Sequence, residues 1–348
     1  MSLAQQLGRP AAVGATRRRP VGRTTVLLVA LAALGGAAVL SVAIGVRTVG
    51  WHDIAAGVAG HPDSVGAAAV AKRLPRTVLA VIVGGALGLA GAVMQGVTRN
   101  PLADPALLGV TSGSALAVVC GIAFFGLTAP SSYLVVAILG AALAAAVVYA
   151  IGSLGRGGHT PLKLALAGAA CTAAFSSLVS AVLLPRIDVM NQFRFWQIGG
   201  VGGADWDRIA MVAPLLTAAL LVGLSSARGL DALALGDDAA AALGVRVGRT
   251  RVHAGLAAIV LCGSATAVAG PIGFVGLVVP HLCRLLVGSA HRWLLPLSVL
   301  VGALLLTLAD VLGRVLTRPA ELDVGIVTAV LGAPFFIALV RRTAGRAR

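Results

Sequence analysis

The chain has 348 residues, of which 58% are hydrophobic and 11% charged, and its formal net charge is +15. A soluble domain carries about a quarter charged residues, so this composition excludes a soluble globule and predicts an all-α, polytopic membrane protein. The positive charges are scattered between apolar runs, which is typical of cytoplasmic loops in membrane proteins rather than of a surface that binds nucleic acid.

The first apolar run, Thr25–Val46, follows five arginines within residues 1–23. A cleavable signal peptide also begins with basic residues, but its apolar core spans only about 7–15 residues. The longer run predicts a retained first helix, preceded by a basic cytoplasmic tail at residues 1–23. No later stretch is long and polar enough for a soluble domain, so residues 24–348 are predicted to form one transmembrane domain.

Further apolar runs of about 20 residues predict nine more membrane spans. They lie at Val78–Thr98, Ala106–Phe125, Tyr133–Ser153, Leu162–Leu184, Ile209–Ser226, Val252–Val268, Phe274–Val287, Trp293–Leu312 and Val324–Val340. Ten spans place both termini on the same side of the membrane. With both termini in the cytoplasm, 18 of the 27 lysines and arginines fall in cytoplasmic segments, which favours this orientation over its inverse.

The second span is bracketed by polar sequence. Arg73 and Arg76 flank Pro75 before it, and the proline-rich turn 99–105 follows it. Arginines at such a position either anchor a helix at the lipid headgroups or form a basic surface for an acidic partner. Polar, helix-breaking sequence between spans is costly in lipid unless it lines a path or meets a partner.

The loop 228–251 contains a candidate docking helix. Asp237 can cap it, Asp238 favours its positive N-terminal end, and Gly244 suits its C-terminal stop. About three turns of helix are predicted, exposed to the cytoplasm between two spans. The alternatives are a docking site for another subunit and an ordinary surface helix that links two spans.

Two features near the C-terminal half also carry alternatives. Gly270–Gly276 contains three glycines and a proline in seven residues, so it cannot form a regular helix; it is either a tight turn or a discontinuous helix end beside a transport path. Asp310 and Arg314 are four residues apart in the ninth predicted span and are expected to pair on one helix face. Asp310 and His281 could alternatively relay protons.

The sequence contains no nucleotide-binding or catalytic motif. The P-loop pattern Gly-x-x-x-x-Gly-Lys-Ser/Thr is missing. The two lysines of the chain, Lys72 and Lys163, follow no glycine-rich loop. All four cysteines lie inside apolar segments without a CxxC pair. We therefore predict a protein that is not an enzyme and has no cofactor or metal site of its own.

Several motifs in order resemble the permease subunit of type II ATP-binding-cassette (ABC) importers, the family that carries ferric siderophores, haem and cobalamin. The matching segments are Arg73–Arg76, Gly91–Gln95, Asn100–Pro105 with Leu108-Gly109, Leu233–Gly236 with Leu243-Gly244, Gly270–Gly276, Val279–His281 with Arg284, His291-Arg292 with Leu295-Pro296, Ala309-Asp310 and Gly332–Pro334. The resemblance extends from about the first span to the C-terminus. It implies a permease domain of ten helices.

The resemblance also implies partners and site residues. The partners are a second permease subunit (identical or related), two ATPase subunits that bind the ATP, and an extracytoplasmic solute-binding protein. The residues that match docking positions for the binding protein are Arg73, Arg76 and Arg314. Those of the cytoplasmic gate are Asn100, Leu102, Thr160 and Pro161. Those of the coupling helix to the ATPase are Leu235, Gly236, Asp237, Asp238, Ala241, Leu243 and Gly244.

The sequence departs from the family pattern at Asp323, where a proline is common, and Glu321 adds a negative charge near Arg314. The resemblance predicts a multi-pass protein of the cytoplasmic membrane that imports a ferric siderophore. Cobalamin and haem are the alternative cargoes, and a proton-coupled secondary transporter is a less favoured alternative mechanism.

Overall fold

The computed structural model describes residues 22–46, 48–61, 63–154 and 161–345, and all of its regular elements there are helices. Seven helices are long and apolar enough to cross a membrane, and three further apolar helices complete the ten predicted spans. The seven are α1 (Arg23–Ala43), α3 (Val65–Thr98), α5 (Pro130–Ser153), α6 (Pro161–Leu183), α8 (Trp206–Ser225), α11 (Val247–Ala269) and α13 (His291–Leu316). The other three are α4 (Val110–Phe125), α12 (Val275–Val287) and α14 (Val324–Gly345).

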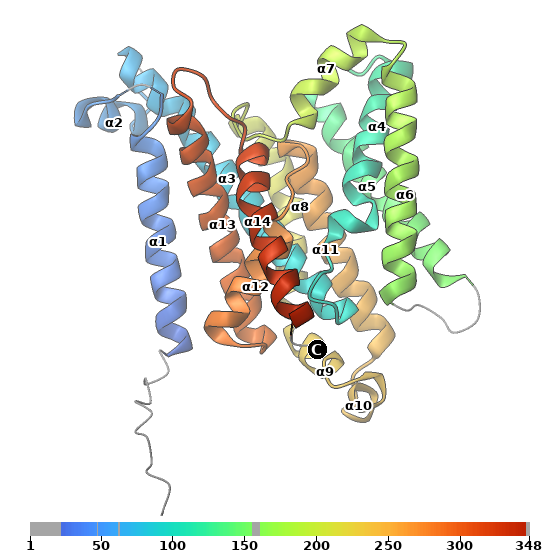
Figure 1. Cartoon of the computed structure of the whole chain (residues 1–348). Helices are drawn as coiled ribbons and strands as arrows, with labels where there is room; N and C mark the ends of the chain where they lie inside the picture. Colours follow the sequence, from blue (N-terminus) through green and yellow to red (C-terminus); the bar gives the residue numbers. More distant parts are fainter. Residues whose placement is uncertain (1–21, 47, 62, 155–160, 346–348) are drawn as a thin grey trace, which may run out of the picture.

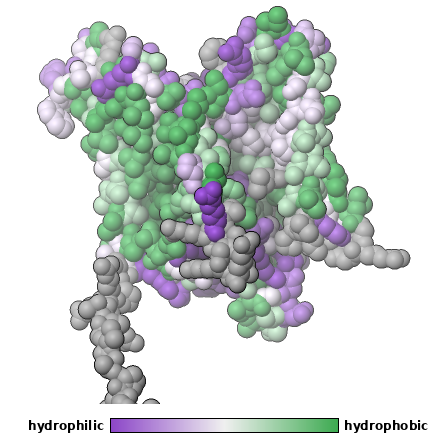
Figure 2. Space-filling view, in the orientation of Figure 1, coloured by the Kyte–Doolittle hydropathy of each residue, from purple (hydrophilic) through white to green (hydrophobic). Residues whose placement is uncertain are grey.

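Short helices lie at the two ends of this bundle (Figure 1). The end that carries α2 (Trp51–Val58) and α7 (Ile187–Gln197) is called the α2 end; the end that carries α9 (Ala227–Leu233) and α10 (Asp237–Ala242) is called the α10 end. Helix α1 starts and α14 finishes toward the α10 end. On the face shown in Figure 2, hydrophobic side chains form an apolar belt between the two ends of the bundle, and polar side chains gather toward those ends.

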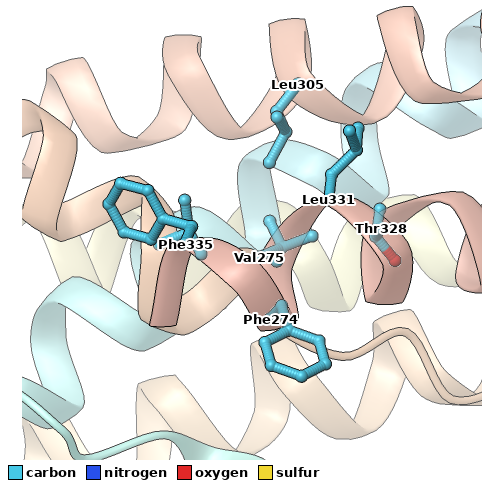
Figure 3. Close-up of a pocket in the computed structure, with 8 residues that line it drawn as sticks. Phe274, Val275, Leu305, Thr328, Leu331 and Phe335 are labelled. Atoms are coloured by element: carbon cyan, nitrogen blue, oxygen red, sulfur yellow. The ribbon is translucent and has the colours of Figure 1, made fainter. Parts of the chain in front are cut away.

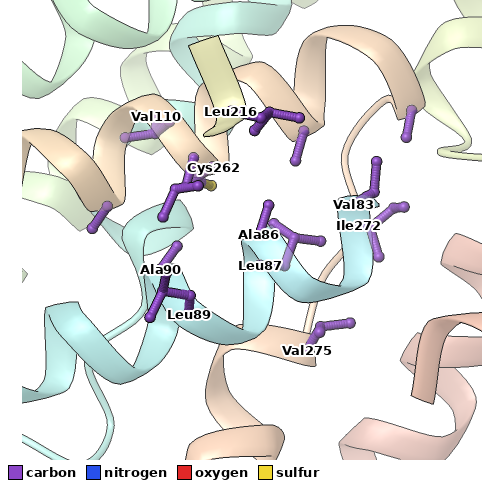
Figure 4. Close-up of a cluster of buried hydrophobic side chains, with 14 of the residues drawn as sticks. Val83, Ala86, Leu87, Leu89, Ala90, Val110, Leu216, Cys262, Ile272 and Val275 are labelled. Atoms are coloured by element: carbon purple, nitrogen blue, oxygen red, sulfur yellow. The ribbon is translucent and has the colours of Figure 1, made fainter. Parts of the chain in front are cut away.

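Helix α3 is the centre of the bundle and packs against α1, α8, α11, α12 and α13. At about 1.5 Å per residue its 34 residues span about 51 Å, well beyond the roughly 30 Å of a bilayer core. Its apolar middle, including Val83, Ala86 and Leu87, faces a core shared with α8, α11 and the segment before α12 (Figure 4).

The helix that carries the second predicted span begins at Val65, 13 residues before Val78, and includes Pro75. Ser64 caps the helix by accepting a hydrogen bond from the Ala67 N–H at 3.0 Å. Helix α2 packs on this first part of α3, with Gly57 against Val70. Capping and tertiary packing therefore stabilise a helix across a proline that sequence alone marks as a break.

Small residues let the central helices approach closely, as predicted. A Cβ added to Gly84 of α3 would overlap the carbonyl oxygen of Gly302 in α13, and one added to Gly91 would overlap that of Gly276 in α12. In a membrane, helix association depends on such backbone proximity because lipid tails are as apolar as the side chains. These contacts tie α12 and α13 directly to α3.

The predicted break at residues 270–276 is confirmed. Helix α11 ends at Ala269 and α12 begins at Val275, with Phe274 in the left-handed backbone region at φ 68°. One backbone group at the break is paired with a distant segment, since the Gly200 N–H donates to the Ala269 carbonyl at 2.7 Å. At 13 residues, α12 is only about 20 Å long, which is shorter than the roughly 30 Å of a bilayer core.

Candidate functional site

A cluster of ionised side chains lies at the α2 end of α3 and α13. Arg76 donates from Nε and Nη2 to Asp310 at 3.0 and 2.9 Å, and from Nη1 to Glu321 at 2.6 Å. Arg314 forms the predicted pair with Asp310, at 3.0 Å, and this interpretation is confirmed. Asp310 therefore holds two guanidinium groups from different helices while its side chain is only 1% exposed.

Arginines of the same cluster cap the end of α1. Arg73 donates to the carbonyl oxygens of Val42 and Ala43, at 3.1 and 3.0 Å. Arg314 donates to those of Ser41 and Ile44, at 2.9 and 3.0 Å. The last carbonyls of a helix lack partners within it and carry partial negative charge, so cationic donors stabilise them. The cluster thereby joins α1, α3 and α13.

The three arginines that the resemblance assigns to binding-protein docking occupy different environments. Arg73 and Arg314 are buried, at 7% and 1% exposure, with their donors directed into the protein. Arg76 is nearer the surface, and its Nη1 meets Glu321, whose side chain is 42% exposed. The surface that a partner can reach in this conformation is therefore the Arg76–Glu321 edge. The docking role stays a prediction.

At the α10 end, the predicted gate segment follows α3. Arg99 adopts a left-handed conformation at φ 50°, and the Asn100 side chain then accepts a hydrogen bond from the Leu102 N–H at 2.9 Å. Asp104 begins the short helix η2 (Pro105–Leu108) by accepting from the Ala106 N–H at 2.9 Å. Burial raises the pKa of the Asp104 carboxyl.

The other two predicted gate residues are less fully described. Thr160 lies outside the described residues, and Pro161 is the first residue of α6. Their proximity to Asn100 and Leu102 therefore stays a prediction.

The predicted docking helix exists, but it is shorter than expected. Helix α10 has six residues, less than two turns, and it follows the separate short helix α9. Its N-cap is Gly236 and not Asp237, which corrects the capping prediction. Gly244 stops the helix as predicted, with φ 79°.

Helix α10 presents apolar side chains at both ends. Leu235 and Leu243 are 67% and 64% exposed, while Ala240 between them is buried against the body of the protein. Asp238 and Ala241 are also exposed. Two exposed leucines on a knob beyond the apolar belt form a surface suited to the groove of another subunit.

Asp237 has a structural role that the sequence did not indicate. Arg251 of α11 donates from Nη1 to one of its carboxylate oxygens and from Nη2 to the other, both at 2.9 Å. Arg99, at the end of α3, donates to the same carboxylate. Helix α10 is therefore tied to two long helices through one side chain.

Two more polar links at the α10 end were not predicted. The Gln95 amide of α3 donates to the Gly276 carbonyl at 3.1 Å and accepts from Arg284 of α12 at 2.6 Å. The Asp231 carboxylate of α9 accepts from the backbone N–H and the ring Nδ1–H of His291, both at 2.8 Å. A glutamine inside an apolar run is a signal that could have indicated the first of these links.

Two cavities lie among the described residues. A cavity of about 110 Å³ between α12, α13 and α14 is lined by Phe274, Leu331 and Phe335, and Thr328 supplies its one side-chain hydroxyl (Figure 3). A larger one of about 430 Å³ lies near the ends of α7 and α11, with Arg208 and Asp323 in its lining. Within the described part of the chain, no group of three or more His, Cys, Asp or Glu side chains could hold a metal ion.

The model of the FecCD transport family matches residues 28–342. The chain belongs to the FecCD transport family. Among curated members, the ferric enterobactin transport system permease protein FepD of Escherichia coli strain K12 is 48% identical over 270 residues, covering 78% of this chain and 80% of the relative. The Fe(3+) dicitrate transport system permease protein FecD of the same strain is 42% identical, covering 89% and 96%.

A solved structure is consistent with this family assignment. A metal-chelate type ABC transporter in an inward-facing conformation is similar with a TM-score of 0.80 and 32% sequence identity, covering 92% of this chain and 99% of that one. The chain is thus an integral membrane protein with the ABC-importer permease fold, and its family implies ABC partner subunits.

Proposed function

We propose that this chain is the permease subunit of an ABC importer that moves a ferric siderophore across the cytoplasmic membrane. Its relatives are named for ferric enterobactin and ferric dicitrate transport, which supports an iron chelate as cargo. ATP would be bound and hydrolysed by separate ATPase subunits. The permease contributes contacts that differ between outward-open and inward-open states, without which a nucleotide cycle cannot drive alternation.

The observation that carries this proposal is the exposed apolar knob at α10. Leu235 and Leu243 project from the end of the molecule toward which α1 starts and α14 finishes. The excess of arginine in the segments at this end supports a cytoplasmic location for it, and for both termini. An ATPase subunit would bind there.

At the opposite end, a solute-binding protein would deliver the chelate. The Arg76–Glu321 edge, with Arg73 and Arg314 behind it, supports docking of a partner with acidic side chains. A second permease subunit, identical or related, would complete the path. The alternative of proton relay through Asp310 is disfavoured because both of its oxygens are engaged by guanidinium groups.

The test replaces both knob leucines with serine in the assembled transporter and measures ATP-driven uptake of radiolabelled iron chelates. Leu184, an exposed leucine that follows α6 at the α2 end, is the matched control position. The proposal predicts loss of ATPase binding and uptake in Leu235→Ser/Leu243→Ser, and normal behaviour in Leu184→Ser. Full uptake in the double variant would contradict it.

The same assay identifies the cargo class. Catecholate, hydroxamate and citrate chelates of iron are compared with haem and cobalamin. Uptake restricted to one of the iron chelates supports the proposal, whereas uptake of haem or cobalamin alone would replace the cargo assignment while leaving the importer mechanism in place.

A further inference from the structure

One acidic side chain joins the docking helix to two long helices at the α10 end. Asp237 is the first residue of α10, and its two oxygens accept from Nη1 and Nη2 of Arg251 at 2.9 Å each. Arg99 donates to Oδ1 of the same carboxylate. A bidentate arginine fixes both the position and the orientation of a carboxylate, which a single contact does not.

Helix α10 is too short to keep its place by its own hydrogen bonds. Six residues are far below the length at which an isolated helix is stable in water. The leucines that flank it, Leu235 and Leu243, are exposed. Ala240 packs inward and Asp237 is ion-paired, so these two residues fix the helix to the rest of the chain.

Arg99 connects this ion pair to the predicted gate. It has a positive φ, which a non-glycine residue keeps only when its surroundings hold it there. The next residue, Asn100, organises the turn through its hydrogen bond to the Leu102 N–H. A displacement of Asp237 therefore acts on the backbone residue that directly precedes the gate segment.

Asp238 is the internal contrast. It carries the same charge on the same helix and is exposed, yet among the described residues no cation lies within 4.0 Å of it. The geometry thus separates the two neighbouring carboxylates. Asp237 links three elements, and Asp238 lies on the exposed surface of α10.

We propose that Asp237 is a positioning residue that transmits movement of the docking helix to the gate segment through Arg99, with Arg251 fixing its orientation. This inference rests on the proposed function, since it assumes an ATPase subunit on α10. It adds a specific route, through Asp237 and Arg99, between that subunit and the gate segment 100–102.

The experiment uses the complete transporter in proteoliposomes and measures the number of chelate molecules imported per ATP hydrolysed. We expect Asp237→Asn to lower this ratio by up to about fivefold, because the three side chains are partly exposed and such ion pairs contribute about 0–1 kcal/mol. The ATPase rate and the amount of bound ATPase subunit should stay within about twofold of the unaltered protein. Asp188→Asn, which removes an exposed carboxylate from α7 at the α2 end, should leave all three quantities unchanged, and Asp237→Glu should restore part of the ratio.

A double-mutant cycle tests the route itself. Arg99→Ala should reproduce the loss, and Arg99→Ala/Asp237→Asn should be no worse than either single variant, because both remove the same interaction. Additive losses would overturn the inference, as would a normal ratio in Asp237→Asn. Loss of ATPase binding in Asp237→Asn would also overturn it and assign the residue to docking. The proposed function fails separately, through normal uptake in the Leu235 and Leu243 double variant.

Discussion

Replacing Asp310 with asparagine should strongly destabilise the fold, because this carboxylate balances two buried cations. Arg76 donates to it at 2.9, 3.0 and 3.2 Å, and Arg314 at 3.0 Å. Asparagine keeps one acceptor oxygen and places an N–H₂ group against the other donor. Both guanidinium groups would then lack their shared counter-charge.

The structure sets the expected size of the effect. Asp310 and Arg314 are each 1% exposed, and removal of one partner from a buried ion pair costs about 3–5 kcal/mol. Arg314 still donates to carbonyl oxygens of α1, so we expect a loss of about 3 kcal/mol, at the lower end of that range. Glu321→Gln is the matched control. It also removes a carboxylate from Arg76, but at an exposed position where pairs contribute about 0–1 kcal/mol.

Equilibrium unfolding in mixed detergent micelles, followed by tryptophan fluorescence, measures both free energies. The reasoning predicts that Asp310→Asn loses several times more stability than Glu321→Gln. Equal losses in the two variants would refute it and would show that the cluster is solvated enough for either acid to be dispensable.

Three further predictions concern packing, pH and docking. Gly302→Leu should lower the free energy of unfolding by about 1–3 kcal/mol or more in the same assay, because its Cβ would overlap the backbone of α3. Gly35→Leu, whose Cβ has open space around it, should be nearly neutral. Similar values for the two variants would contradict the close packing. Burial raises the pKa of Asp323 above its ordinary 3.8, so the folded state holds that proton more tightly than the unfolded state and stability should fall as pH rises from 3.8 through the raised pKa. Asp323→Asn should remove this part of the pH dependence, and an unchanged slope would count against it. If a binding protein docks on Arg76, Glu321→Gln should tighten its binding to the permease by up to about fivefold, and Arg76→Gln should weaken that binding. Interferometry on the permease in nanodiscs measures both affinities. No change in either variant would argue against docking at Arg76.

Hydropathy predicted the membrane architecture because lipid leaves the backbone few alternatives. Every N–H and C=O within the apolar belt must be paired inside the protein, so long apolar runs become helices. The ten runs accordingly appear as helices in the expected order. The first part of α3 was missed because Pro75 is a local break signal, and the packing of α2 that overrides it involves residues outside the predicted span.

Among the site residues, a contact within one helix could be predicted from the sequence, whereas contacts between helices could not. The Asp310–Arg314 pair was predictable because residues four apart share a helix face. The partners of Asp237 lie 138 and 14 residues away, and Arg76 is 234 residues from Asp310. No local pattern gives such contacts, since they depend on how the helices are arranged in space. Composition revealed which residues were polar in an apolar chain, and the fold determined what they bind.

Transport by the chain with and without its ATPase subunits tests the central claim most directly. The permease is reconstituted in proteoliposomes, alone or with the ATPase subunits and binding protein, and iron-chelate accumulation is followed after addition of ATP or after imposing a pH gradient. The account predicts accumulation only with the ATPase subunits and ATP. Accumulation by the permease alone, under either driving force, would contradict it.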